Sequence, residues 1–110
     1  MQQESLTALA SHHLEIARTT SSGRSAHTLY GGHDHVLRQT VIALKAGTRL
    51  DEHESPGEAT LQVLRGRVTL VAGDLRAEGA TGDLMPIPDA RHSLEAVEDS
   101  AILLTVAKRL

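Results

Sequence analysis

Apolar and polar positions follow two different rhythms along the chain, and the first rhythm is helical. Five positions near the N-terminus recur at spacings of three and four residues: Leu6, Leu9, Ala10, His13 and Ala17. This spacing places them on one face and predicts a helix over residues 5–18, with Ser5 as its cap. The segment TTSSGR at 19–24 ends it. Because so short a helix is only marginally stable alone, we expect it to lie along the domain or against a partner.

After Ser25 the pattern changes to short apolar runs separated by glycine-containing or charged turns. The predicted strands are AHTLY (26–30), HVLRQTVIAL (35–44), ATLQVL (59–64), VTLVA (68–72), LRAE (75–78), LMPIP (84–88), HSLEAV (92–97) and AILLTVAK (101–108). Two prolines confine LMPIP to a sheet edge or to strand ends. Eight short strands at regular spacing predict a β-sandwich or a small barrel.

Composition limits the kind of core that this chain can build. Its 110 residues suffice for one domain, and 40% of them are apolar, with no Phe, no Trp and one Tyr. The core must therefore be aliphatic, and branched aliphatic residues favour β structure. We expect the helix and a linker over residues 1–24 and the β domain over residues 25–110.

Charge and cysteine content argue against several classes of function. The net charge is −3 and the 11 basic residues are scattered, so nucleic acid is not an expected partner. The chain has no cysteine, which excludes disulfides, thiolate ligands and a cysteine nucleophile. No run approaches the roughly 20 apolar residues of a membrane helix, and the N-terminus does not resemble a secretory signal. We expect a cytoplasmic protein with no membrane partner.

Two glycine-framed segments carry the candidate chemistry. In GTRLDEHESPGEATLQVLRG (47–66), five residues separate Gly47 from His53, and a glycine closes the segment. In GDLMPIPDARHSLEA (82–96), five residues separate the glycine from Pro88, and His92 follows. These segments, in this order and separated by two hairpins, resemble the two motifs of the cupin family.

The resemblance covers about residues 27–108 and implies a fold. Cupins are all-β, and this chain is expected to form a cupin-type double-stranded β-helix (jelly-roll barrel) preceded by one short N-terminal α-helix. The resemblance also suggests a homodimer, since the sheet edges of so small a barrel need cover.

Metal-binding cupins direct three histidines and one glutamate from the two motifs into the barrel, and this chain matches that set in part. The resemblance assigns His53 to the first histidine and His92 to the third. Ser55 stands at the second histidine position, and Ala59 stands at the glutamate position, directly after Glu58. The implied site is one divalent metal ion held by His53, His92 and Glu58, with Zn, Fe, Ni and Mn not distinguished.

Regular pleating would turn Glu58 outward, so only a bulge would bring it to the metal. Without metal, the two imidazoles and Ser55 would still form a polar spot in an aliphatic cavity, which can orient a small ligand. Leu61 and Met85 are candidate lining residues. Arg38 and Arg91 are candidates to meet a carboxylate at the mouth of the barrel.

Two further histidines, His33 and His35, stand two residues apart. On a strand this spacing can chelate a metal, and it also occurs in solvated strand starts. If their strand lines the barrel, His35 is a candidate third ligand beside His53 and His92.

Three functions remain open on these residues. The first is a small-molecule-binding cupin of unknown ligand with a reduced or absent metal site. The alternative is a divalent-metal-dependent cupin enzyme of oxygenase, isomerase or lyase type that uses His53, His92 and Glu58. The third is an interaction protein whose barrel dimerises while the helix serves a partner. Retention of two histidines from separate motifs favours the first two over the third.

Overall fold

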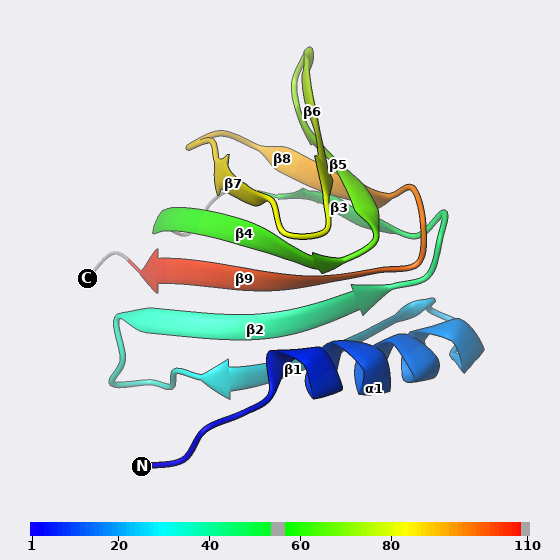
Figure 1. Ribbon diagram of the computed structural model, residues 1–110. Helices are drawn as coiled ribbons and strands as arrows, with labels where there is room; N and C mark the ends of the chain where they lie inside the picture. The colour runs from blue at the N-terminus through cyan, green and yellow to red at the C-terminus, as the bar shows by residue number, and fades with distance from the viewer. Residues whose placement is uncertain (54–56, 109–110) are drawn as a thin grey trace.

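The computed structural model describes residues 1–53 and 57–108, with residues 52 and 53 described by their backbone alone. One helix precedes two antiparallel sheets (Figure 1). In chain order the elements are α1 (Leu6–Thr19), β1 (Arg24–Tyr30), β2 (Leu37–Leu44), β3 (Arg49–His53), β4 (Gly57–Arg65), β5 (Arg67–Ala72), β6 (Leu75–Ala80), β7 (Leu84–Ile87), β8 (His92–Ala96) and β9 (Ser100–Lys108). No helix in these ranges is long and apolar enough to cross a membrane.

The strands divide into a five-stranded sheet, in the order β1-β2-β9-β4-β7, and a four-stranded sheet, in the order β3-β8-β5-β6. Strands from both ends of the chain lie side by side, since β2 and β4 both pair with β9. This jelly-roll arrangement confirms the predicted fold class. The two sheets pair within themselves and stay separate, so the described strands form a sandwich whose edges, including β6 and β7, remain open.

The main core lies between the sheets and consists of aliphatic side chains and one methionine. Its buried members are Leu44, Leu61, Val63, Val68, Leu70, Met85, Leu94, Ala96 and Ile102. Alternation along each strand directs these residues inward, because successive side chains of a strand point to opposite faces. A Cβ at Gly79 would meet the Met85 sulfur, so a glycine is needed where β6 passes over that side chain.

Helix α1 packs on the outer face of the five-stranded sheet, against β1 and β2 (Figure 1). A second buried cluster joins it to the sheet: Ala10, Leu14, Ala17, Ala43 and Ala101. The small alanines let helix and sheet approach closely. Ser5 caps the helix by accepting a hydrogen bond from the Ala8 amide at 3.1 Å, as predicted from the sequence.

An ion pair fixes the C-terminal end of α1. The Arg18 Nε donates to Asp99 at 2.7 Å, and the Ala46 amide donates to the other oxygen of the same carboxylate at 2.8 Å. The pKa of Asp99 is lowered, first by the Ala46 amide and then by Arg18. One carboxylate therefore joins the helix end to two loops of the sandwich.

Two differences from the sequence prediction concern the candidate site. The strand β3 was not predicted, because RLDEH contains one apolar residue, and it forms through pairing with β8. The predicted run from His35 begins as a strand only at Leu37, so His33 and His35 lie in the exposed loop before β2.

Candidate functional site

The two motif histidines come together in the β3–β8 ladder. His53 is the register partner of His92, although 38 intervening residues separate the two in the chain. Between Leu50 and His53 the register shifts by one residue. Leu50 faces inward opposite Leu94, and uninterrupted alternation would set residue 52 opposite His92. Because of the register shift, His53 lies opposite His92 instead. Bulges commonly change the direction of side chains in this way beside functional sites.

His92 is buried among aliphatic side chains and held by its own backbone turn. Its exposed fraction is 5%, and its Nδ1 lies 2.9 Å from the carbonyl oxygen of Ala90. A carbonyl oxygen can only accept, so Nδ1 carries the proton. In the neutral ring Nε2 is then the nitrogen with the lone pair. This is the arrangement that prepares a histidine to accept a hydrogen bond or to bind a metal through Nε2.

A small internal cavity lies beside His92. Its volume is about 30 Å³, and its walls are Ile42, Leu50, Leu61, Leu70, Ile87, His92, Leu94, Ile102 and Leu104. Histidine is the sole polar residue type in this lining. The space can hold a water molecule or a methyl-sized group but no complete organic ligand, whose sites typically measure hundreds of cubic ångströms. The cavity therefore fits the end of a ligand rather than a whole molecule.

The mouth of the sandwich is defined here as the end where His92 and Ile87 line this cavity. Arg38 belongs to the same end, since Arg38 pairs with Val106 and Val106 pairs with Ala59 across the larger sheet. Arg38 is exposed and shares a strand face with the inward-facing Ile42. Arg91, next to His92, is also exposed. Both predicted arginines thus stand at accessible positions near the mouth.

The other predicted site residues are placed differently. Leu61 lines the cavity, whereas Met85 lies deeper in the core, against Gly79. Glu58 is exposed, and the regular ladder with β9 puts it on the face opposite Leu61. Ser55 lies outside the described residues. These placements leave the roles of Met85, Glu58 and Ser55 as predictions.

The described side chains do not complete a metal site. Within residues 1–51 and 57–108, no group of three or more His, Cys, Asp or Glu side chains could hold an ion. The exposed His35 packs edge-on against Tyr30, with ring centroids 5.1 Å apart. His92 is therefore the one predicted ligand whose described geometry suits a metal, through Nε2.

A cluster of histidines that sequence reasoning missed lies between the middle of α1 and β1. His13 and His27 stack with centroids 5.7 Å apart, and His12 meets His13 edge-on. The His13 Nδ1 lies 2.7 Å from the Ser25 hydroxyl. Burial lowers the pKa of His13, and the neighbouring His12 and His27 lower it further. The stacked rings join helix to β1 instead of converging on one point, so the cluster is structural.

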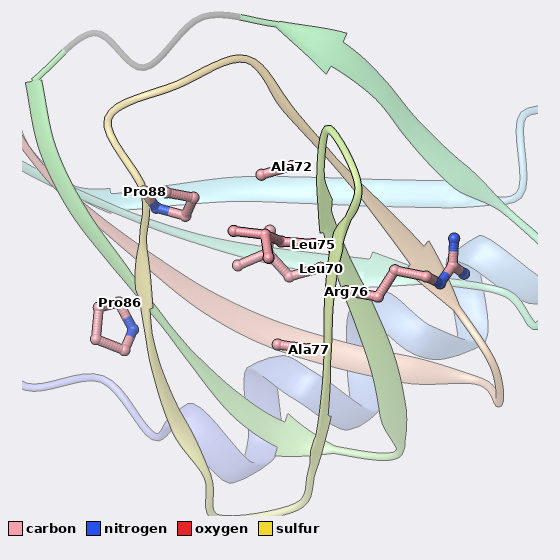
Figure 2. Close-up of a pocket in the computed structure, with 7 residues that line it drawn as sticks. All are labelled: Leu70, Ala72, Leu75, Arg76, Ala77, Pro86 and Pro88. Atoms are coloured by element: carbon pink, nitrogen blue, oxygen red, sulfur yellow. The ribbon is translucent and has the colours of Figure 1, made fainter.

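A second concavity opens between the β5–β6 hairpin and β7. Figure 2 shows Leu70 and Leu75 pointing into the space between the hairpin and Pro86 and Pro88, with Arg76 turned away. Its volume is about 170 Å³. Leu70 also lines the cavity beside His92, so this one side chain separates the inner space from the outer groove.

Comparison with known proteins agrees with this architecture. No family profile matches the chain, and no curated protein matches it either. Among solved structures, a conserved protein of unknown function from Streptococcus pyogenes is similar at 29% identity and a TM-score of 0.73, over 83% of this chain and 79% of that one. An RmlC-like cupin from Desulfovibrio desulfuricans is similar at 26% identity and a TM-score of 0.66, over 76% and 81%.

A more distant likeness is to a mutant of salicylate 1,2-dioxygenase from Pseudoaminobacter salicylatoxidans in complex with gentisate. It has 19% identity and a TM-score of 0.77, over 96% of this chain and 33% of the longer enzyme. Two antiparallel sheets in this strand order define a jelly-roll protein of the kind that recurs among these structures. The chain has the fold of a single-domain cupin.

Proposed function

We propose that the protein binds a small aliphatic molecule at the mouth, with the apolar end of the ligand entering beside His92. One observation carries the proposal: a buried imidazole, fixed with Nε2 as its acceptor, opens on an aliphatic cavity. A ligand that donates an O–H or N–H to Nε2 and places a methyl-sized group among the leucines would match both features.

Two arginines stand at the rim, which also carries the acidic Glu58 and Asp89 near Ile87. Arg38 is exposed on the inward face of β2 at the mouth. Arg91 is the last residue of the loop before β8. A carboxylate elsewhere on the ligand would find guanidinium groups there. The proposed ligand class is therefore a short aliphatic hydroxy acid or amide-bearing acid.

The test is a fragment titration followed by amide and methyl NMR, using short hydroxy acids, the matching plain acids and short alcohols. We expect the hydroxy acids to shift resonances of Ile42, Leu50 and Ile87, and His92→Leu to remove those shifts. Val97→Ala, a change at an exposed position, is the control. Shifts that persist unchanged in His92→Leu would overturn the proposal, and so would the absence of any shift at millimolar fragment.

The second candidate function is a metal-dependent enzyme of oxygenase, isomerase or lyase type. The register pairing of His53 with His92 favours it, because it brings two motif positions together in the fold. A divalent ion there would act as a Lewis acid or bind oxygen. His92 offers Nε2 for such an ion, and the described side chains add no complete ligand set.

Metal analysis of protein prepared without a histidine tag separates the two functions. Stoichiometric metal in the unmodified protein and none in His53→Ala, His92→Ala would support the enzyme. His33→Ala, His35→Ala is the matched control, since it removes two exposed imidazoles elsewhere. Equal metal in all three proteins would rule out the motif histidines as ligands.

We also propose that the protein is a homodimer. The edge strands β1, β6 and β7 are each paired on one side in the described sheets, and such edges are commonly covered in native assemblies. Sedimentation equilibrium tests this directly, and a single species of 11.8 kDa would contradict it.

A further inference from the structure

The free edge of β6 has the features of a protein-binding strand. Within its sheet β6 pairs with β5 alone, and the β5–β6 hairpin projects away from the helix (Figure 1). Leu75, at the hairpin end, is 74% exposed. Across the open seam lies β7, whose Pro86 has no N–H to offer to a neighbouring strand. The gap between the edge strands β6 and β7 is therefore not closed by backbone hydrogen bonds, and the free edge of β6 is left for another strand.

The hairpin geometry decides which backbone groups point to this edge. Ala72 and Leu75 pair across the two-residue turn and exchange hydrogen bonds, as residues flanking such a turn do. Along an antiparallel ladder the bonded positions alternate, so Leu75 and Ala77 bond toward β5. Arg76 and Glu78 then direct their N–H and C=O groups to the free edge. An added strand would bond through these two residues.

The side chains divide by face in the same alternation. Leu75 and Ala77 share the inner face and line the groove of about 170 Å³ with Leu70. Arg76 and Glu78 lie on the outer, charged face. A strand that covers this edge must therefore present small or apolar residues on one face and charges of complementary sign on the other.

We propose that the occupant is β6 of a second copy of this chain, antiparallel, with the two-fold axis at Ala77. This inference rests on the proposed homodimer and not on the proposed ligand. With Ala77 opposite itself, Arg76 lies opposite Glu78 of the second copy, and Glu78 lies opposite its Arg76. Opposite charges directly across a ladder stabilise it, and like charges destabilise it.

The charges also exclude the neighbouring registers. Side chains must stay on matching faces, so the register can shift only by moving the axis one residue along β6. An axis at Arg76 would set arginine against arginine, and an axis at Glu78 would set glutamate against glutamate. Of the three, the Ala77 register alone pairs opposite charges. This self-complementarity is what a two-fold interface requires.

Ion pairs already present would continue across the junction. Arg76 contacts Glu95 at 3.0 Å, and Glu78 contacts Arg67 at 2.8 Å. Joining two copies gives a row of alternating sign, from Arg67 and Glu78 of one copy to Arg76 and Glu95 of the other. Each exposed ion pair contributes little binding energy by itself. We therefore expect these pairs to determine the register and the partner, and not the strength of the dimer. Leu75 of each copy would lie opposite Gly79 of the other and lose part of its exposure to water, which supplies apolar burial.

Charge reversal tests the pairing. We expect a dimer for the unmodified protein in sedimentation, a dimer dissociation constant raised about tenfold or more in Arg76→Glu and in Glu78→Arg, and recovery in the double variant. Arg24→Glu, on the far edge strand β1, is the charge-matched control, and circular dichroism checks folding of each variant. A monomeric unmodified protein overturns both the homodimer and this surface. A dimer unaffected by the single reversals overturns the surface alone.

A thiol tests the register itself. The chain has no cysteine, so Ala77→Cys introduces a single thiol. At the two-fold axis the two Cα atoms would lie about 4.5 Å apart, within the range of a disulfide. In Leu75→Cys the two thiols would be four residues apart along the strands, about 13 Å, which is too far. Rapid covalent dimer from Ala77→Cys and none from Leu75→Cys supports the register, and the reverse result overturns it.

Discussion

The imidazole of His92 donates a hydrogen bond from Nδ1 to the carbonyl oxygen of Ala90, two residues earlier, while its ring is buried against leucines. The bond is local, so it is formed by the loop before β8 without help from distant elements. It fixes the ring orientation and the position of the ring proton. With Nδ1 as the donor, the neutral ring has its lone pair on Nε2.

In its neutral form, the ring of His92 is expected to be the Nδ1–H tautomer. Long-range proton–nitrogen NMR distinguishes a protonated from an unprotonated ring nitrogen, and Nδ1 should give the protonated signal. His92→Asn, whose amide can keep the bond to Ala90, should stay folded and lose the ligand shifts. A protonated Nε2 with unprotonated Nδ1 would contradict the geometry.

Truncation of the cavity wall should cost far more stability than truncation of the surface. Leu61→Ala removes a buried leucine between the sheets, and we expect a loss of about 2–5 kcal/mol in the free energy of unfolding. Leu84→Ala, on the neighbouring strand β7 and 66% exposed, should cost about 0.5 kcal/mol or less. Urea denaturation of the two variants measures the difference, and equal losses would place the core elsewhere.

The Asp99 carboxylate should make stability depend on acid pH. Its pKa lies below the ordinary value of 3.8 because of the Ala46 amide and then Arg18. A carboxyl group whose pKa is lowered on folding makes its full contribution to the free energy of unfolding above its unfolded pKa. This contribution is lost as pH falls through the folded pKa. Asp99→Asn should therefore cost about 1 kcal/mol or less at pH 7, because the group is partly exposed.

Chemical denaturation at a series of pH values measures this contribution. The gap between the unmodified protein and Asp99→Asn should narrow below about pH 4. Asp34→Asn, in the exposed loop before β2, provides the control and should show no such gap. A gap that is constant from pH 7 to pH 2 would contradict the assigned role.

The stacked histidines should weaken the docking of α1 at mildly acidic pH. The pKa of His13 is held below 6.5 by burial first, then by His12 and His27. For a histidine with a lowered pKa the unfolded chain takes up the proton more readily, so stability is complete above about pH 6.5 and declines as pH falls below it. Glu4, 3.7 Å from the His27 Nε2, partly offsets the repulsion when His27 is charged.

Thermal unfolding followed by helical circular dichroism tests this dependence. His13→Asn, which can keep a hydrogen bond to Ser25, should flatten the decline in melting temperature between pH 7.5 and pH 5. His33→Asn, at an exposed loop position, should leave it unchanged. If both variants behave like the unmodified protein, the cluster has no such effect.

Hydrophobic pattern predicted the helix and eight of the nine strands in the described residues, because those segments carry their own periodicity. The strand β3 escaped prediction for the same reason, since a single leucine among charged residues gives no period. It exists through its ladder with β8, which is a tertiary effect. The charged strand is nevertheless the one that brings His53 to His92.

The part of the site that lies in the two glycine-framed motifs was predictable from the sequence. Spacing from glycines singled out His53 and His92, and their register agrees with that pairing. The narrowness of the cavity was not predictable, because it depends on how Leu61, Leu94 and Ile102 pack between two sheets. The His13–His27 stack was missed too, since it requires the helix to fold back onto a strand that follows it in the chain.

The absence of Phe, Tyr and Trp from the core has a spectroscopic consequence. With no Phe or Trp in the sequence and its one Tyr at an exposed position, the methyl groups between the sheets feel almost no magnetic anisotropy apart from that of His92. Their resonances should crowd together in the free protein. An aromatic compound entering at the mouth would spread these methyl resonances apart. The size of each methyl shift would then report how far the compound reaches between the sheets.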